Sequence, residues 1–166
     1  TLLKTLLKNK GEYRIRLGMM NPNHFLKIKK ELIKIFEDER VYKFLHLPLQ
    51  SGSDKVLKKM NRKYSTKDYF SCINFIKKNI PDLTISTDVI VGFPTETKKD
   101  FEQTISALRK FKPLVVNISR YGKRKGTVAN DFEGQISEME KKERSREVTA
   151  LLKEQMLEQN KELIGQ

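Results

Sequence analysis

Cysteine is almost absent from this sequence, since Cys72 is the only one among 166 residues. A single cysteine excludes an internal disulfide framework and favours a reducing compartment, so we expect a cytoplasmic protein. No apolar run approaches the length of about 18 residues that marks a membrane-spanning helix, and no signal peptide is recognisable near residue 1. The sequence begins at Thr1 without an initiator Met, which we interpret as a piece of a longer chain.

Acidic residues are scarce in the first half of the chain. Residues 1–80 contain 19 Lys and Arg against 7 Asp and Glu, whereas residues 81–166 contain 15 against 14. The net charge of +13 therefore lies almost entirely in the first half. A polyanionic partner such as RNA would explain this excess, and so would the solvated helix faces of a Lys-rich protein.

Strand and helix patterns alternate along the chain. Strands are expected at residues 13–17, 44–49, 83–91 and 114–119. Helices are expected at 22–39, at 54–61 with Ser53 as cap, from Thr66 as cap, at 97–111, and at 137–163 with a Ser137–Glu140 capping box. This alternation is typical of parallel βαβ units, whose right-handed crossovers place the strands side by side in chain order.

Each expected strand has one aliphatic and one polar face. The polar faces include Arg16, His46, Asp88 and Asn117, and several of these groups lie near the C-terminal end of their strand. Burying such groups in a dry core is costly unless partners are supplied. We therefore favour a barrel lumen that holds a polar ligand over an open sheet with one face in water. The fold class predicted is α/β, a partial parallel TIM-type (βα) barrel of about four strands with outer helices.

Three sequence blocks, in this order, resemble the radical SAM (S-adenosylmethionine) methylthiotransferases. They are HLPLQSGS at residues 46–53 with KKMNR at 58–62, DVIVGFPTET at 88–97 with Asp100 and Phe101, and RKGTVA at 124–129. The family commonly has Pro where this sequence has Lys125. GMMNP at 18–22 and RVYKFLH at 40–46 are similar to the archaeal and eukaryotic branch that acts on threonylcarbamoyladenosine in tRNA.

This resemblance implies an enzyme whose partners are tRNA, SAM and 4Fe–4S clusters. Reductive cleavage of SAM would give a 5′-deoxyadenosyl radical, which removes hydrogen from C2 of the modified adenosine at position 37, beside the anticodon, before a methylthio group is installed. Residues 1–136 would form the later part of the barrel. Residues 137–166 would form a long helix that leads to an RNA-binding β domain.

Three parts of such an enzyme are missing from the sequence: the cysteine triad of the first barrel strand, the N-terminal domain with the auxiliary cluster, and the RNA-binding β domain. Iron–sulfur ligation needs several thiolates, so we expect this chain alone to be inactive, with no catalytic or metal-binding residue. Cys72 is interpreted as a core residue. Open sheet edges also predict self-association of the isolated chain, or cover by its own apolar N-terminal segment.

Six residues are candidates for cofactor binding. Gln50 and Ser51 are expected to hydrogen-bond the ribose or amino-acid end of SAM, on the argument that Ser53 already caps the next helix. Arg16 is expected to pair with the SAM carboxylate or a substrate phosphate; an ion pair with Asp88 is the alternative, and Asp88 is also a candidate for substrate contact. Ile90 would pack on adenine or belong to the core, and Gly92 would allow close approach of a ligand.

The loop after the last strand is dense in cations. Arg120, Lys123, Arg124 and Lys125 would attract an RNA phosphate backbone, or would form a solvated loop. Two other functions remain open: methylthiolation of an aspartate in a ribosomal protein, which the GMMNP block disfavours, and RNA binding without catalysis. Glu96 is interpreted as a favourable charge at the N-terminus of the following helix.

Overall fold

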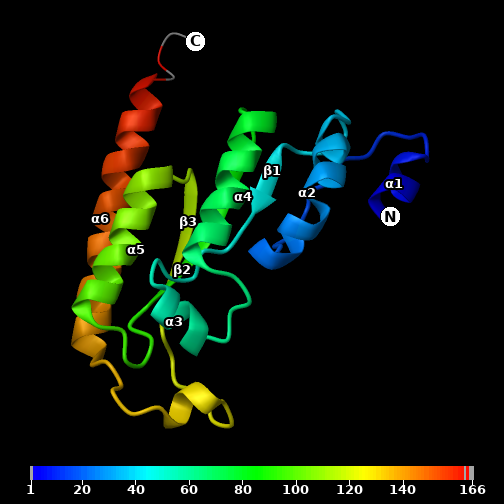
Figure 1. The fold of residues 1–166 in the computed structure, drawn as a ribbon. Helices are drawn as coiled ribbons and strands as arrows, with labels where there is room; N and C mark the ends of the chain where they lie inside the picture. Colours follow the sequence, from blue (N-terminus) through cyan, green and yellow to red (C-terminus); the bar gives the residue numbers. More distant parts are fainter. Residues whose placement is uncertain (1, 163, 165–166) are drawn as a thin grey trace.

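A three-stranded parallel sheet forms the centre of the fold (Figure 1). The computed structural model describes residues 2–162 and 164. The strands are β1 (Phe44–His46), β2 (Thr84–Val91) and β3 (Val115–Arg120), and they lie in the order β1-β2-β3. All pairings are parallel, with Leu45 opposite Ile85 and Asp88 opposite Asn117. The predicted α/β class with parallel strands in chain order is confirmed.

Six α-helices and one short 3-10 helix are present in the described part of the chain. They are α1 (Leu2–Leu7), α2 (Pro22–Phe36), α3 (Asp54–Lys59), α4 (Thr66–Asn79), α5 (Lys98–Phe111), η1 (Val128–Asp131) and α6 (Glu138–Glu162). The end predicted for the last helix, residue 163, lies outside the described residues.

The strand predicted at residues 13–17 does not form. This segment makes a single isolated bridge, Ile15 with Val41, and Met19 just after it makes another with His46. Ile15 lies opposite the turn that precedes β1, and β1 itself is three residues long. So short an edge offers too few backbone groups for a continuous ladder, although the bridges do place the segment beside β1.

The caps of α4 and α6 also differ from those predicted. Thr97, expected as the first residue of its helix, instead caps α5 in a reciprocal box with Asp100, and α4 is capped by Ser65 rather than by the predicted Thr66. The Asp68 carboxylate accepts from the Ser65 N–H and the Ser65 hydroxyl accepts from the Asp68 N–H, so the cap lies one residue earlier than predicted. At α6 the Ser137 hydroxyl accepts from the N–H of Glu140, whose carboxylate bonds Arg144.

The aliphatic faces of the strands form the core. Leu45, Leu47, Leu49, Val89 and Val91 are fully buried. Helices α5 and α6 contact each other, and α6 contacts β2 and β3, so it lies along the sheet for much of its length (Figure 1). The other face of the sheet carries the polar side chains, and it is only partly covered: Asp88 is half-buried and Asn117 is exposed.

Candidate functional site

A polar network crosses the three strands. The Asp88 carboxylate accepts from the Asn117 amide (2.9 Å) and lies 2.8 Å from Nε2 of His46. The sheet register brings the three residues together on one face, as their alternation predicted. Arg16 does not pair with Asp88 in the described structure; its guanidinium lies 4.2 Å from the centre of the Phe44 ring. The alternative ion pair weighed from the sequence is therefore wrong.

Gln50 has an unusual backbone and an unsatisfied side chain. Its φ is 66°, and its backbone bonds Asp88 (2.8 Å) and Ile90 (3.0 Å) of the neighbouring strand. Non-glycine residues with positive φ are uncommon and tend to lie at functional sites. The side chain is buried, and Oε1 has no hydrogen-bond partner within the described residues. A buried amide oxygen without a partner can accept a hydrogen bond from a donor group of a bound ligand.

Ser51 and Ser53 serve the loop between β1 and α3. Ser51 is fully buried, and its hydroxyl accepts from the Ser53 N–H (3.2 Å) and lies 3.5 Å from Thr104 Oγ1. The Ser53 hydroxyl donates to Asp100 (2.7 Å) and makes no cap bond to α3. The argument that left Ser51 free for a ligand is therefore wrong. Its contact with SAM stays a prediction, and full burial weighs against it.

A cleft of about 680 Å³ opens at the C-terminal ends of β2 and β3. Ile90, Phe93 and Tyr121 are part of its apolar lining, with Met60, Val128 and Ala129, and the rings of Phe93 and Tyr121 meet edge to face at 5.2 Å. Its charged lining is entirely cationic: Lys59, Arg62, Arg120 and Arg124. The structure thus brings together the residue predicted to pack on adenine and two of the four residues predicted to bind RNA. Lys123 and Lys125 are exposed but outside this lining.

Gly92 is held by neighbours within the chain. Its φ is 71°, and a Cβ at this position would lie 2.3 Å from Cγ of Lys141 on α6. The space that a missing Cβ leaves is therefore filled by Lys141. Contact between Gly92 and a ligand stays a prediction.

An ion pair that sequence reasoning missed holds the turn after β2. Glu96 is 1% exposed; its carboxylate accepts from the Gly92 N–H (2.7 Å) and pairs with the buried guanidinium of Arg144. Arg144 also donates to the Glu96 carbonyl and to Glu140. Glu96 thus forms a buried ion pair with Arg144 of α6, in addition to its predicted position just before α5. The sequence did contain an indication, because the buried side of α6 follows helical spacing: Lys141, Arg144, Val148, Leu151 and Gln155.

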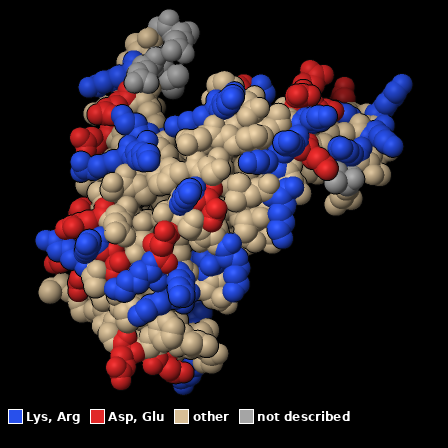
Figure 2. All heavy atoms as spheres, in the orientation of Figure 1, with Lys and Arg blue, Asp and Glu red and all other residues tan. Residues whose placement is uncertain are grey.

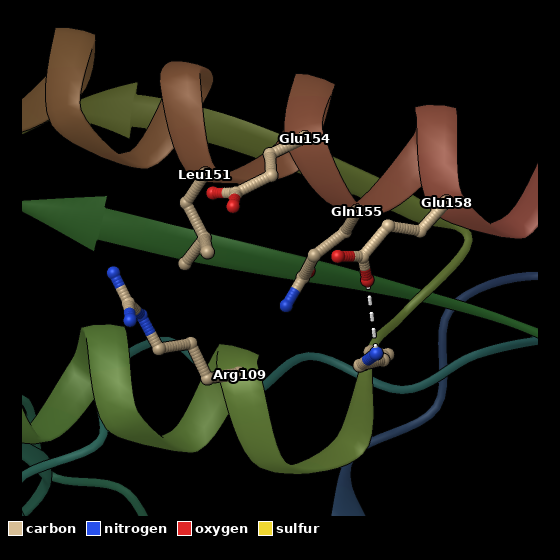
Figure 3. A pocket seen from close by; sticks show the side chains of 6 residues that line it. Arg109, Leu151, Glu154, Gln155 and Glu158 are labelled. Carbon is tan, nitrogen blue, oxygen red and sulfur yellow. Dashed lines mark hydrogen bonds and ion pairs between the residues drawn. The ribbon is translucent and has the colours of Figure 1, made fainter.

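Basic side chains gather over α3 on the face shown in Figure 2. A second, smaller cavity of about 180 Å³ lies between α5 and α6 (Figure 3). There Lys112 pairs with Glu158 (3.1 Å) and the Gln155 amide donates to the Leu108 carbonyl (3.3 Å). Lys112 shortly precedes β3, so this cavity lies towards the N-terminal ends of the strands. Its polar groups hold the two helices together, and we assign no ligand to it.

Cys72 packs in the core, as predicted. It is fully buried, its thiol lies 3.8 Å from the Pro22 carbonyl, and burial raises its pKa to about 12. A thiol with so high a pKa is a poor metal ligand, because the thiolate is the ligating form. Within the described residues no group of three or more His, Cys, Asp or Glu side chains is arranged to hold a metal. The donor set of an iron–sulfur cluster therefore does not fit the residues described.

The chain belongs to the radical SAM superfamily, whose sequence pattern matches residues 2–108. It is 42% identical to the probable threonylcarbamoyladenosine tRNA methylthiotransferase of Archaeoglobus fulgidus, over 99% of this chain and 38% of that protein. It is 39% identical to the tRNA-2-methylthio-N(6)-dimethylallyladenosine synthase of Caldicellulosiruptor saccharolyticus, over 99% of this chain and 34% of that protein. The predicted resemblance to tRNA methylthiotransferases is confirmed, and the chain spans little more than a third of the length of such relatives.

A solved structure shares the fold. Coproporphyrinogen III oxidase of Escherichia coli, described as a radical SAM enzyme, superimposes with a TM-score of 0.71 at 18% identity, over 93% of this chain and 36% of that chain. The partial-barrel architecture predicted from the sequence is therefore confirmed. None of the helices in the described part of the chain is both long enough and apolar enough to cross a membrane.

Proposed function

We propose that this chain is part of a cytoplasmic tRNA methylthiotransferase that modifies C2 of N6-threonylcarbamoyladenosine at position 37 by radical SAM chemistry. The observation that carries the proposal is the cleft beside Ile90, where an apolar floor meets cations at the C-terminal ends of the strands. Barrels of this kind have their active site at that end. The names of the relatives, which act on tRNA, support the same assignment.

The described residues fit SAM, which when bound would supply the radical-forming group. The unsatisfied Gln50 amide would accept from the ribose or amino group, and Ile90 would pack on the adenine. Arg16 would meet the carboxylate, and Asp88, fixed by His46 and Asn117, would orient substrate. The ligands of the 4Fe–4S clusters would come from parts of the protein outside this sequence.

The modification itself tests the proposal. Full-length protein, reconstituted anaerobically with iron, sulfide and SAM, should place a methylthio group on threonylcarbamoyladenosine in tRNA, detected by mass spectrometry of the digested nucleosides. Methylthiolation only of dimethylallyladenosine, or of a ribosomal-protein aspartate, would overturn the assigned substrate.

Gln50→Ala should weaken SAM binding to the full-length protein by about threefold to tenfold, the value of one ordinary hydrogen bond. Both side chains carry a Cβ, so the change adds little backbone strain at φ 66°. Titration calorimetry measures the affinity, with Gln103→Ala on the exposed side of α5 as matched control. Equal affinity in Gln50→Ala and wild type would remove Gln50 from the cofactor site.

Replacing Lys123, Arg124 and Lys125 together by Ala should weaken tRNA binding and flatten its salt dependence. The log–log slope should fall by roughly 0.7 to 0.9 for each phosphate that the loop no longer neutralises. The matched control replaces Lys27, Lys30 and Lys34, three exposed lysines of α2. If both triple variants shift the slope equally, the loop contributes only to the general charge.

A further inference from the structure

We propose that Lys59 and Arg62 form the second wall of a phosphate-binding site for the RNA substrate, across the cleft from Arg120 and Arg124. This inference rests on the proposed function and adds a wall from α3 to the loop predicted from the sequence. The four cations line one cleft of about 680 Å³, although 58 residues or more separate the two walls in the chain.

Arg62 is held in place but has no acidic partner. The chain leaves α3 through Asn61, whose φ is 56°, and the Arg62 N–H donates to the Leu57 carbonyl (2.9 Å). Nε of Arg62 is buried and unpartnered within the described residues. Asp54 and Asp68, which line the neighbouring surface, already accept from backbone N–H groups at the start of α4. The guanidinium is thus positioned beside these carboxylates but forms an ion pair with neither of them in the described structure.

Lys59 extends the same wall towards the turn after β2. Its ammonium group donates to the Thr95 hydroxyl (2.6 Å), a neutral partner that leaves the charge uncompensated. Across the cleft, Arg120 is close enough to Glu138 to help lower the pKa of that carboxyl, after the larger effect of Lys141.

The four cationic side chains of the cleft would attract an RNA phosphate and repel the sulfonium cation of SAM. We therefore assign these side chains to phosphate and only the Ile90 side of the cleft to the adenine of SAM. Arginine also bonds phosphate oxygens in pairs. The Tyr121 hydroxyl in the same lining is buried and unpartnered within the described residues, so it offers the RNA strand one further hydrogen bond.

Arg62→Gln and Lys59→Gln, made separately in the full-length protein, test the site. Each should lower the salt slope of tRNA binding by roughly 0.7 to 0.9 and leave SAM affinity unchanged. Arg62→Lys should keep most of the slope because it keeps the charge. The matched control is Lys58→Gln, which removes the same charge from the neighbouring, exposed position of α3 outside the cleft; its slope should stay as in the wild type.

The outcomes separate this inference from the proposed function. If the wild type binds tRNA and both variants have the wild-type salt slope, the proposal of a second phosphate-binding wall is wrong, while the proposed methylthiotransferase function is unaffected. An equal drop in slope for Lys58→Gln, or weaker SAM affinity with normal tRNA binding, also overturns the second wall. If the wild type binds no tRNA, both fail. Circular dichroism shows whether each variant is folded. If Arg62→Gln is unfolded, the salt slope of Lys59→Gln alone tests the second wall.

Discussion

Arg144→Met should destabilise the protein by about 3 to 5 kcal/mol, because it leaves a buried carboxylate without its cation. The side chains of Arg144 and Glu96 are 6% and 1% exposed. Urea unfolding, monitored by circular dichroism, measures the change. Glu140→Gln is the control, since that partner is 46% exposed, and it should cost less than about 1 kcal/mol. A double variant with Glu96→Gln should recover part of the stability, because no buried charge then remains.

The same variant should show a distinct pH dependence. Burial raises the pKa of Glu96, while the Gly92 N–H and the Arg144 guanidinium oppose that rise. Without Arg144 the folded-state pKa rises further, so the folded protein binds a proton more readily than the unfolded chain does. Stability of Arg144→Met relative to the wild type should therefore improve as the pH falls from neutrality through that pKa. If Arg144→Met is destabilised equally at neutral and mildly acidic pH, the unpaired Glu96 carboxylate is not the cause of the destabilisation.

Gly52→Ala should be nearly as damaging, at about 3 kcal/mol or more, the upper end of the usual cost of overpacking. The added Cβ would lie 2.4 Å from the Gln103 carbonyl oxygen and 2.5 Å from the Thr104 Cα. Both are backbone atoms of α5, so relief requires the helix or the loop to move. Thermal unfolding against Gly122→Ala, where the new Cβ meets nothing within 4 Å, provides the comparison. Equal melting temperatures would contradict this packing.

The fold was largely predictable because its strands follow a simple alternation. Leu45, Ile85, Val89 and Val91 of β1 and β2 face the helices, and the polar set of His46, Asp88 and Asn117 falls on the other face together with Ile90. The segment at residues 13–17 has the same alternation. It fails to form a full strand because pairing also requires a long enough partner edge, which alternation within one segment does not reveal.

The placement of the candidate site residues was predictable where they follow a strand closely. Gln50, Ile90 and Arg120 lie at or beside the strand ends, as expected. The pairing of Glu96 with Arg144 joins residues 48 positions apart, and only the packing of α6 on the turn after β2 brings them together. The side chain of Ser53 was wrongly expected to cap α3 for a similar reason, because its partner Asp100 comes from α5.

The attachment of α6 to the turn after β2 also governs how the helix opens. Lys141 and Arg144, in its first turns, are locked against Gly92 and Glu96, whereas Met156 and Leu157 near its other end are exposed. Backbone amides in the first half of α6 should therefore exchange with solvent only when the cleft end of the sheet opens as well, while the last turns fray independently. Helix α6 is thus anchored by buried groups at the cleft, whereas near its other end the exposed Lys112–Glu158 ion pair joins it to the end of α5.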